Sequence, residues 1–286
     1  MIQASELILN PDGSVYHLNL LPEQIAQDII FVGDQDRVEK ITQNFDSIEF
    51  STQKREFKTQ TGYLNGKRIT VISTGIGPDN IDIVMNELDA LVNIDLETKI
   101  PKANLKSLNI IRIGTSGSLQ PQIPVDSFVL SQYAIGLDNM LRSYQIDHIC
   151  HSNIENAFVQ HTNWDQLKGK PYCIAAAPIL QNVFENNNIF TGITATAPGF
   201  YGPQGRILRL DIQDKNLNSK MDSFEINNLK ITNLEMETAA IYGLSALLGH
   251  RALSLSAIIA NRSSGTFSQN PEKTIVKLIN LVLEKF

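Results

Sequence analysis

The chain has 286 residues, of which 42% are hydrophobic and 19% charged, a composition typical of a globular protein with a sizeable core. Its net charge of −6 gives no overall basic surface, so we expect no nucleic acid partner. No apolar run approaches the roughly 20 residues that span a bilayer, the N-terminus does not resemble a signal peptide, and the two cysteines form no CxxC pair. We therefore expect a cytoplasmic protein without a membrane partner.

Short β-branched runs alternate with helical patterns along the chain, after a polar, turn-rich lead-in at residues 1–14 that we expect to be mobile. The expected strands are residues 29–32, 69–73, 109–113, 127–134, 172–176, 192–196 and 253–260. The expected helices are residues 36–44, 79–92, 154–167, 179–186, 234–248 and 271–284. The last helix is the best defined, because Asn270 is a good N-cap and Pro271 suits the first helical position.

This alternation predicts an α/β fold: a single-domain α/β/α sandwich over residues 1–286 with a central mixed β-sheet. Residues 93–108, which are charged and contain a proline, interrupt the pattern, and we expect them to form an inserted loop.

Three arginines stand at or beside the ends of strand-like runs, next to glycines or small hydroxyl residues. They are Arg37 in Gly33-Asp-Gln-Asp-Arg37, Arg55 in Arg55-Glu-Phe57, and Arg112 in Arg112-Ile-Gly-Thr-Ser-Gly117. Arg112 lies inside the run 109–113, where a cation is costly to bury without a partner. Guanidinium groups match the oxygens of phosphate or carboxylate. The sequence therefore predicts an anion pocket built from separate stretches of chain.

Two glycine-rich segments bear on this pocket. Residues 73–80, with Gly75 and Gly77, form a strand, a turn and a helix start that present N–H groups, although a tight structural turn explains them better. Residues 113–117 are expected to form a similar turn, which adds two hydroxyls beside Arg112 and favours an anion site. The alternative there is a serine–threonine turn with Arg112 in a structural ion pair.

Residues 233–238 are expected to open a helix that carries Glu235 and Glu237. Residues two apart lie about 200° around a helix, so the two carboxylates should not face one ligand. We expect one of them to face inward and the other to serve the helix N-terminus.

Residues 200–206 combine aromatic rings with an amide and a guanidinium in one loop. A ring can stack on a flat heterocycle, while Gln204 and Arg206 offer the donors and acceptor that match the edge of a pyrimidine. A surface turn with a packed aromatic is the alternative. His148 and His151 flank Cys150 without a second ligand pair, so we expect no metal.

Together these segments resemble the nucleoside phosphorylase family of the hexameric type, and most closely its uridine phosphorylase branch. The resemblance runs from about residue 15 to the C-terminus. The matching blocks are Tyr16-His-Leu, Gly33-Asp-Gln-Asp-Arg37, Arg55-Glu-Phe57, Ser73-Thr-Gly-Ile-Gly77, Arg112-Ile-Gly-Thr-Ser-Gly117, Phe200-Tyr-Gly-Pro-Gln-Gly-Arg206, Glu235-Met-Glu237 and Ile259-Ala-Asn-Arg262.

The resemblance implies a role for each matching residue. Phosphate would be held by Gly33, Arg37, Arg112 and Thr115, with Arg55 reaching it from a neighbouring subunit. The ribose would contact Met236, Glu237 and the neighbour's His17, and the base would contact Phe200, Gln204, Arg206, Ile259 and Ala260. Arg112, Arg206 and Glu237 would be the catalytic residues. Sites shared in this way imply a homodimer or a hexamer of dimers.

The implied activity is reversible phosphorolysis of uridine to uracil and ribose 1-phosphate, with nucleoside and inorganic phosphate as partners and no cofactor. Gln35 replaces the family's usual proline, and Gly202-Pro203 reverses the order of the branch's two residues, which puts the base specificity in question. Asn261 stands near the position of an aspartate in the purine branch, which favours a pyrimidine. The alternatives are a purine nucleoside phosphorylase, a nucleosidase of the same fold, and a non-catalytic nucleoside or phosphate sensor.

Overall fold

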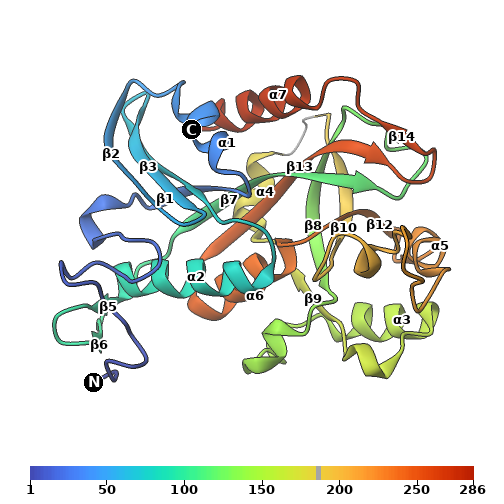
Figure 1. The fold of residues 1–286 in the computed structure, drawn as a ribbon, viewed down its shortest axis with the longest axis horizontal. Helices are drawn as coiled ribbons and strands as arrows, with labels where there is room; N and C mark the ends of the chain where they lie inside the picture. Colours follow the sequence, from blue (N-terminus) through green and yellow to red (C-terminus); the bar gives the residue numbers. More distant parts are fainter. Residues whose placement is uncertain (185–187) are drawn as a thin grey trace.

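A large mixed β-sheet with helices on both faces forms the body of the computed structural model, which describes residues 1–184 and 188–286 (Figure 1). Its strands run in the order β11-β12-β10-β8-β13-β7-β1-β4-β3-β2, with β14 paired to β13, β9 paired to β8, and a further contact between β12 and β7. Helices α1 and α7 lie on one side of the central strands, and α2 and α6 lie on the other. The predicted fold class, an α/β sandwich around a mixed sheet, is confirmed.

The strands of the main sheet are β1 Asp28–Val32, β2 Ser47–Lys54, β3 Phe57–Leu64, β4 Lys67–Ser73, β7 Asn109–Ser118, β8 Phe128–Gly136, β9 Tyr172–Ala175, β10 Phe190–Thr196, β11 Glu225–Ile226, β12 Leu229–Glu235, β13 Arg251–Asn261 and β14 Thr266–Phe267. The helices are α1 Gln35–Thr42, α2 Pro78–Asn93, α3 Ser152–Thr162, α4 Pro178–Val183, α5 Leu217–Asp222, α6 Thr238–Leu248 and α7 Pro271–Leu283. Within residues 1–184 and 188–286, no helix is long and apolar enough to cross a membrane.

Four neighbouring strands at the centre, β4, β1, β7 and β13, run parallel. Apolar side chains fill both faces of these strands, as in other parallel sheets covered by helices. Because the strands are parallel, their carboxyl ends meet at one edge of the sheet, where open α/β sheets bind ligands. Gly33 follows β1 and Gly75 follows β4 at this edge.

Two helices begin where the sequence predicts. The Asp34 carboxylate caps α1 by accepting a hydrogen bond from the N–H of Asp36 at 3.0 Å. At α7 the Asn270 side chain accepts from the N–H of Lys273, and Pro271 occupies the first turn as expected.

The expected helix at residues 234–248 is wrong at its start. Leu234 and Glu235 end strand β12, and α6 begins only at Thr238. The expected turn at 113–117 is also wrong, because β7 continues through it to Ser118 by pairing with β13. In both places the neighbouring strands of the sheet decide the backbone conformation, which local propensity cannot show.

Other elements also differ from the expectation. Helix α3 ends at Thr162, five residues before the expected end, where Asn163 adopts a left-handed conformation with φ of 47°. Helix α4 ends at Val183, and part of the expected helix 179–186 lies outside the described residues. The hairpin of β2 and β3 was not expected, because β2 is polar and largely exposed.

The insertion at 93–108 contains a two-stranded hairpin of β5 Ile94–Asp95 and β6 Ile100–Pro101. It contacts the lead-in at residues 1–14. The N–H of Ile2 donates to the carbonyl of Lys99 at 2.8 Å, and the Lys99 ammonium donates to the carbonyl of Leu7 at 2.9 Å.

Candidate active site

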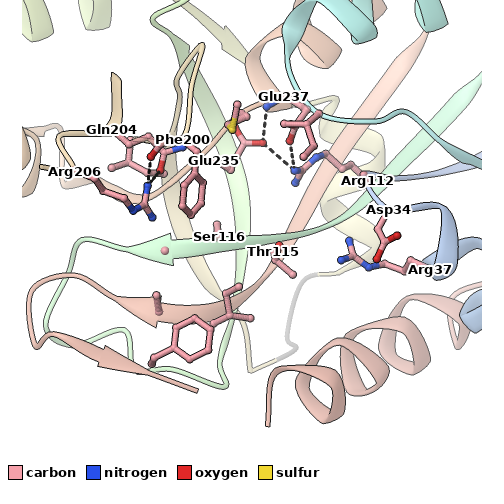
Figure 2. Close-up of a pocket in the computed structure, with 18 of the residues that line it drawn as sticks. Asp34, Arg37, Arg112, Thr115, Ser116, Phe200, Gln204, Arg206, Glu235 and Glu237 are labelled. Carbon is pink, nitrogen blue, oxygen red and sulfur yellow. Dashed lines mark hydrogen bonds and ion pairs between the residues drawn. The ribbon is translucent and has the colours of Figure 1, made fainter. Parts of the chain in front are cut away.

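A cavity of about 1170 Å³ opens at the carboxyl edge of the parallel strands. Of the residues that the sequence assigned to a site, it brings together all except His17 and Arg55. Figure 2 shows the arginines Arg37 and Arg112 at one end of it, and Gln204 and Arg206 at the other. The residues brought together are Gly33, Arg37, Arg112, Thr115, Phe200, Gln204, Arg206, Met236, Glu237, Ile259 and Ala260.

Arg112 lies in a buried cluster of charges beneath the cavity. Its Nη2 lies 2.5 Å from Glu237 Oε2 and 3.2 Å from Glu235 Oε2, and all three side chains are almost fully buried. Burial lowers the pKa of Arg112, but the two carboxylates outweigh this effect and raise it above the ordinary value. The structural ion pair is therefore present, and Arg112 also lines the cavity.

The two glutamates depart from the helix geometry expected for them. Because Glu235 ends β12 and Glu237 precedes α6, the 200° separation does not apply, and both carboxylates reach Arg112. Glu235 serves the start of α6 as expected, because it accepts hydrogen bonds from the N–H groups of Glu237 and Thr238. The expectation that the two glutamates do not face one ligand is wrong, because both line the cavity.

Gly114 makes room for the Arg112 guanidinium. A Cβ atom at Gly114 would lie 1.8 Å from Arg112 Nη1 and 2.5 Å from its Cζ. The side chain of Arg112 therefore folds back over its own strand, which only glycine permits at this position.

Glu237 is held from two sides. Its Oε1 accepts a hydrogen bond from the N–H of Gly77 at 2.9 Å, and its Oε2 pairs with Arg112. Gly77 adopts a φ of 100°, a conformation that favours glycine, so the turn after β4 directs its N–H at this carboxylate. Burial raises the pKa of Glu237, and Arg112 counteracts that effect.

Arg37 differs from Arg112 because it has no ion-pair partner within residues 1–184 and 188–286. Its Nη1 donates to the carbonyl of Ile113 at 3.2 Å. Burial and the neighbouring charge of Arg112 both lower the pKa of Arg37. Arg37 therefore lacks a carboxylate partner of its own in the described structure, and an anion in contact with its guanidinium would supply one.

The opposite end of the cavity carries the aromatic and amide groups. Arg206 stacks over the ring of Phe200, with Cζ 3.8 Å from the ring centroid, and its Nη1 donates to Gln204 Oε1 at 2.6 Å. Gln204 is buried in a short 3₁₀ turn, Gly202–Gln204, and the Arg262 guanidinium donates to its carbonyl at 2.5 Å. The loop is thus held by contacts within itself, and its Phe200, Gln204 and Arg206 line the cavity although Phe200 is about half exposed.

The side chain of Asn261, at the end of β13, makes its hydrogen bonds to other residues of the protein. Its Nδ2 donates to the carbonyls of Gln120 and Ile123 at 2.9 and 2.8 Å, and its Oδ1 accepts from the N–H of Ser264. An amide used in this way cannot act as a general acid toward a base.

His17 and Arg55 do not line this cavity. Arg55 is exposed in the tight turn between β2 and β3, with a φ of 55°. His17 lies beside α2, where its Nδ1 contacts Glu87 Oε1 at 2.6 Å. Their expected roles at a neighbour's site remain predictions.

Several residues of the cavity wall were missed from the sequence. Gln35 was expected to change only the stiffness of its loop, but its Nε2 donates to the carbonyl of Arg55 at 2.7 Å and its Oε1 accepts from Gln53. Proline could not make these bonds. The presence of glutamine where the family usually has proline was therefore the sequence signal for these contacts. Ser116 and Arg262 also line the cavity, and both lie inside matching blocks of the sequence although no role was assigned to them. Phe267, which lies outside those blocks, had no signal in the sequence.

No group of three or more His, Cys, Asp or Glu side chains that could hold a metal occurs within residues 1–184 and 188–286. Cys150 and Cys173 are free, and burial raises the pKa of the Cys150 thiol to about 12. A thiol of this kind stays protonated and is a poor nucleophile.

Known proteins resemble the chain over nearly its whole length. The family model described as "Phosphorylase superfamily" matches residues 27–284. A uridine phosphorylase of Thermococcus kodakarensis is 29% identical over 92% of this chain and 83% of its own. A purine nucleoside phosphorylase of Thermoanaerobacter is 27% identical over 94% and 97%.

One solved structure extends the comparison to three dimensions. A crystal structure of a Trypanosoma brucei nucleoside phosphorylase, described as showing uridine phosphorylase activity, has a TM-score of 0.87 and 30% identity, and 98% of each chain is covered. The resemblance inferred from the motifs is confirmed, and the chain belongs to the phosphorylase superfamily.

Proposed function

We propose that this protein catalyses the reversible phosphorolysis of uridine to uracil and ribose 1-phosphate, with inorganic phosphate as co-substrate. The observation that carries the proposal is the division of the cavity. An arginine without an ion-pair partner in the described structure, Arg37, lies at one end, an aromatic ring with an amide and a guanidinium lies at the other, and Glu237 lies between them. This order suits an anion, a sugar and a base in one line.

At the anion end, Arg37 would bind phosphate together with Thr115 and the N–H groups near Gly33. Arg112 would serve both substrates. Its Nη2 contacts the two carboxylates, while its Nη1 makes a long contact of 3.5 Å to Ser254 Oγ and would donate to phosphate. Such charge-assisted bonds fix the phosphate oxygens in position, which is largely an orientation effect.

In the reaction an oxygen of phosphate attacks C1′ of the ribose as the bond from C1′ to N1 of uracil breaks. Both electrons of that bond leave with uracil, which takes up the proton that hydrogen phosphate loses as it becomes the ester of ribose 1-phosphate. Bound phosphate is itself the nucleophile, so no nucleophilic side chain is required. Glu237 would accept hydrogen bonds from the 2′- and 3′-hydroxyls, while Met236 packs beneath the ring of the sugar.

At the base end, Phe200 would stack on uracil, and Gln204 and Arg206 would bind its carbonyl and N–H edge. Arg206 is the group placed to stabilise negative charge on the leaving base, a role comparable to that of an oxyanion hole. Ile259 and Ala260 would pack against the ring. The bonds of Asn261 to the protein favour a pyrimidine, because they leave no acid for a purine N7.

Completion of the site requires a second copy of the chain. Arg55 and His17 lie outside the cavity of their own subunit, and in the proposal they act at the cavity of a neighbour. Dimer and hexamer both satisfy this requirement.

The test is to incubate the protein with uridine in the presence and absence of phosphate. We expect uracil release that depends on phosphate and produces ribose 1-phosphate. Uracil release at the same rate without phosphate would indicate a nucleosidase. Binding of uridine or phosphate without turnover would indicate a sensor. A panel of uridine, thymidine, inosine and adenosine separates the pyrimidine from the purine activity.

A further inference from the structure

Glu87, on α2, holds the segment that carries His17. Its carboxylate accepts hydrogen bonds from the N–H of His17 at 2.9 Å, the N–H of Leu18 at 2.8 Å and the imidazole Nδ1 of His17 at 2.6 Å. Glu87 lies outside the cavity and takes no part in the site described above.

These bonds fix the protonation pattern of the His17 ring. An ionised carboxylate can only accept hydrogen bonds, so Nδ1 must carry the proton that it donates to Glu87. In the neutral imidazole Nε2 is then the acceptor. Within residues 1–184 and 188–286 no hydrogen-bond partner is found for Nε2, and about a quarter (27%) of the His17 side chain is exposed.

A second contact places this segment beside Arg55. The Lys54 ammonium donates to the carbonyl of Tyr16 at 2.5 Å and lies 4.5 Å from the centroid of its ring. Figure 1 shows the N-terminal segment next to α2 and the β2–β3 hairpin. The segment that carries His17 is therefore held by Glu87 of α2 on one side and by Lys54, the residue before Arg55, on the other.

We propose that Glu87 is a positioning residue. It holds the His17 imidazole so that Nε2 accepts a hydrogen bond from the 5′-hydroxyl of a nucleoside bound to a second copy of this chain. The inference rests on the proposed function, and it adds to that function the residue that sets the orientation and tautomer of His17. A carboxylate that fixes a functional imidazole through its other nitrogen is a recurrent device.

The test compares Glu87→Gln with the wild type on two substrates, uridine and 5′-deoxyuridine. The amide would donate to Nδ1 and move the imidazole proton to Nε2, so the acceptor is lost. We expect kcat/KM for uridine to fall about 10-fold, the size of one ordinary hydrogen bond. We expect no change with 5′-deoxyuridine, which has no hydroxyl to donate, and no change in the KM for phosphate.

Two further variants keep the test decisive. Asp82→Asn removes a carboxylate from the same helix, one bonded to Tyr144 and Asn86, and should leave both substrates unaffected. His17→Ala should show the same preference between substrates as Glu87→Gln, and the double variant should be no worse than His17→Ala alone. If Glu87→Gln does not fold, kcat/KM for uridine and 5′-deoxyuridine is measured for His17→Ala and Glu87→Ala instead.

An equal loss on both substrates, or unchanged kinetics with uridine, would overturn the positioning role and leave the proposed function standing. A wild type that releases no uracil from uridine and phosphate would overturn the proposed function, and this inference with it.

Discussion

Arg37 and Arg112 face the same cavity, but they have different partners. Arg112 is neutralised by Glu235 and Glu237, whereas Arg37 bonds to a neutral carbonyl and has its pKa lowered by burial and by Arg112. A buried arginine without a carboxylate costs stability unless a ligand supplies the charge. We interpret this unpaired cation as the main binding determinant for phosphate.

Replacement of Arg37 by alanine should weaken phosphate binding selectively. We expect kcat/KM for phosphate to fall on the order of 100-fold, as for other charge-directed donors, while the KM for uridine changes little. Phosphate should raise the melting temperature of the wild type but not of the variant. Arg251→Ala, which alters an exposed arginine at the opposite end of β13, is the matched control. An unchanged phosphate response in Arg37→Ala would exclude Arg37 from the anion site.

At the scale of elements, β7 carries much of the site. It pairs with β1 and β13 in parallel and contacts β12 in the antiparallel direction near Gly117. This last contact brings the end of β12, with Glu235, against the strand that carries Arg112. Gly114 completes the arrangement by leaving space for the guanidinium.

Substitution of Gly114 by alanine should therefore displace Arg112. We expect the free energy of unfolding to fall by about 1–3 kcal/mol, as in other overpacked cores, and phosphorolysis to be lost with the ion pairs. Urea denaturation and the uridine assay measure the two effects. Ser256→Ala is the control, because Ser256 faces Gly114 in register and its buried hydroxyl has no hydrogen-bond partner in the described structure. Wild-type stability in Gly114→Ala would show that Arg112 does not need this space.

At the scale of the whole molecule, one surface bears groups that its own cavity does not use. Arg55 and His17 lie outside the cavity that contains the other expected site residues, and the segments that carry them are joined by the bond of Lys54 to Tyr16. A closed two-fold pair of chains would exchange such groups reciprocally. A strictly monomeric protein should accordingly be poorly active.

Subunit mixing tests this exchange. Arg55→Ala and Glu237→Gln should each be inactive alone, but their mixed dimers combine an intact cavity with an intact Arg55. If chains pair at random, an equal mixture should recover about a quarter of wild-type activity. Mixing Arg55→Ala with the double variant should recover none. Activity in Arg55→Ala alone at the wild-type level would show that each cavity is complete within its own chain.

The sequence by itself determined the fold class, the order of most elements and part of the cavity wall. Apolar runs that alternate with helical patterns, and capping residues such as Asp34 and Asn270, act locally. They can therefore be recognised in the sequence. Glycines with arginines beside them also form local patterns, which is why Arg37 and Arg112 were found, whereas the role of Glu237 came from the family resemblance.

Only the tertiary structure decided how those residues pair. The turn expected at 113–117 is a strand, and Glu235 ends a strand instead of opening a helix, because pairing with β13 and β10 overrides local preference. The ion pairs of Arg112, the bond of Gln35 to Arg55 and the hold of Glu87 on His17 join residues far apart in the chain. Such contacts depend on which strands and helices become neighbours, and no local pattern specifies that choice.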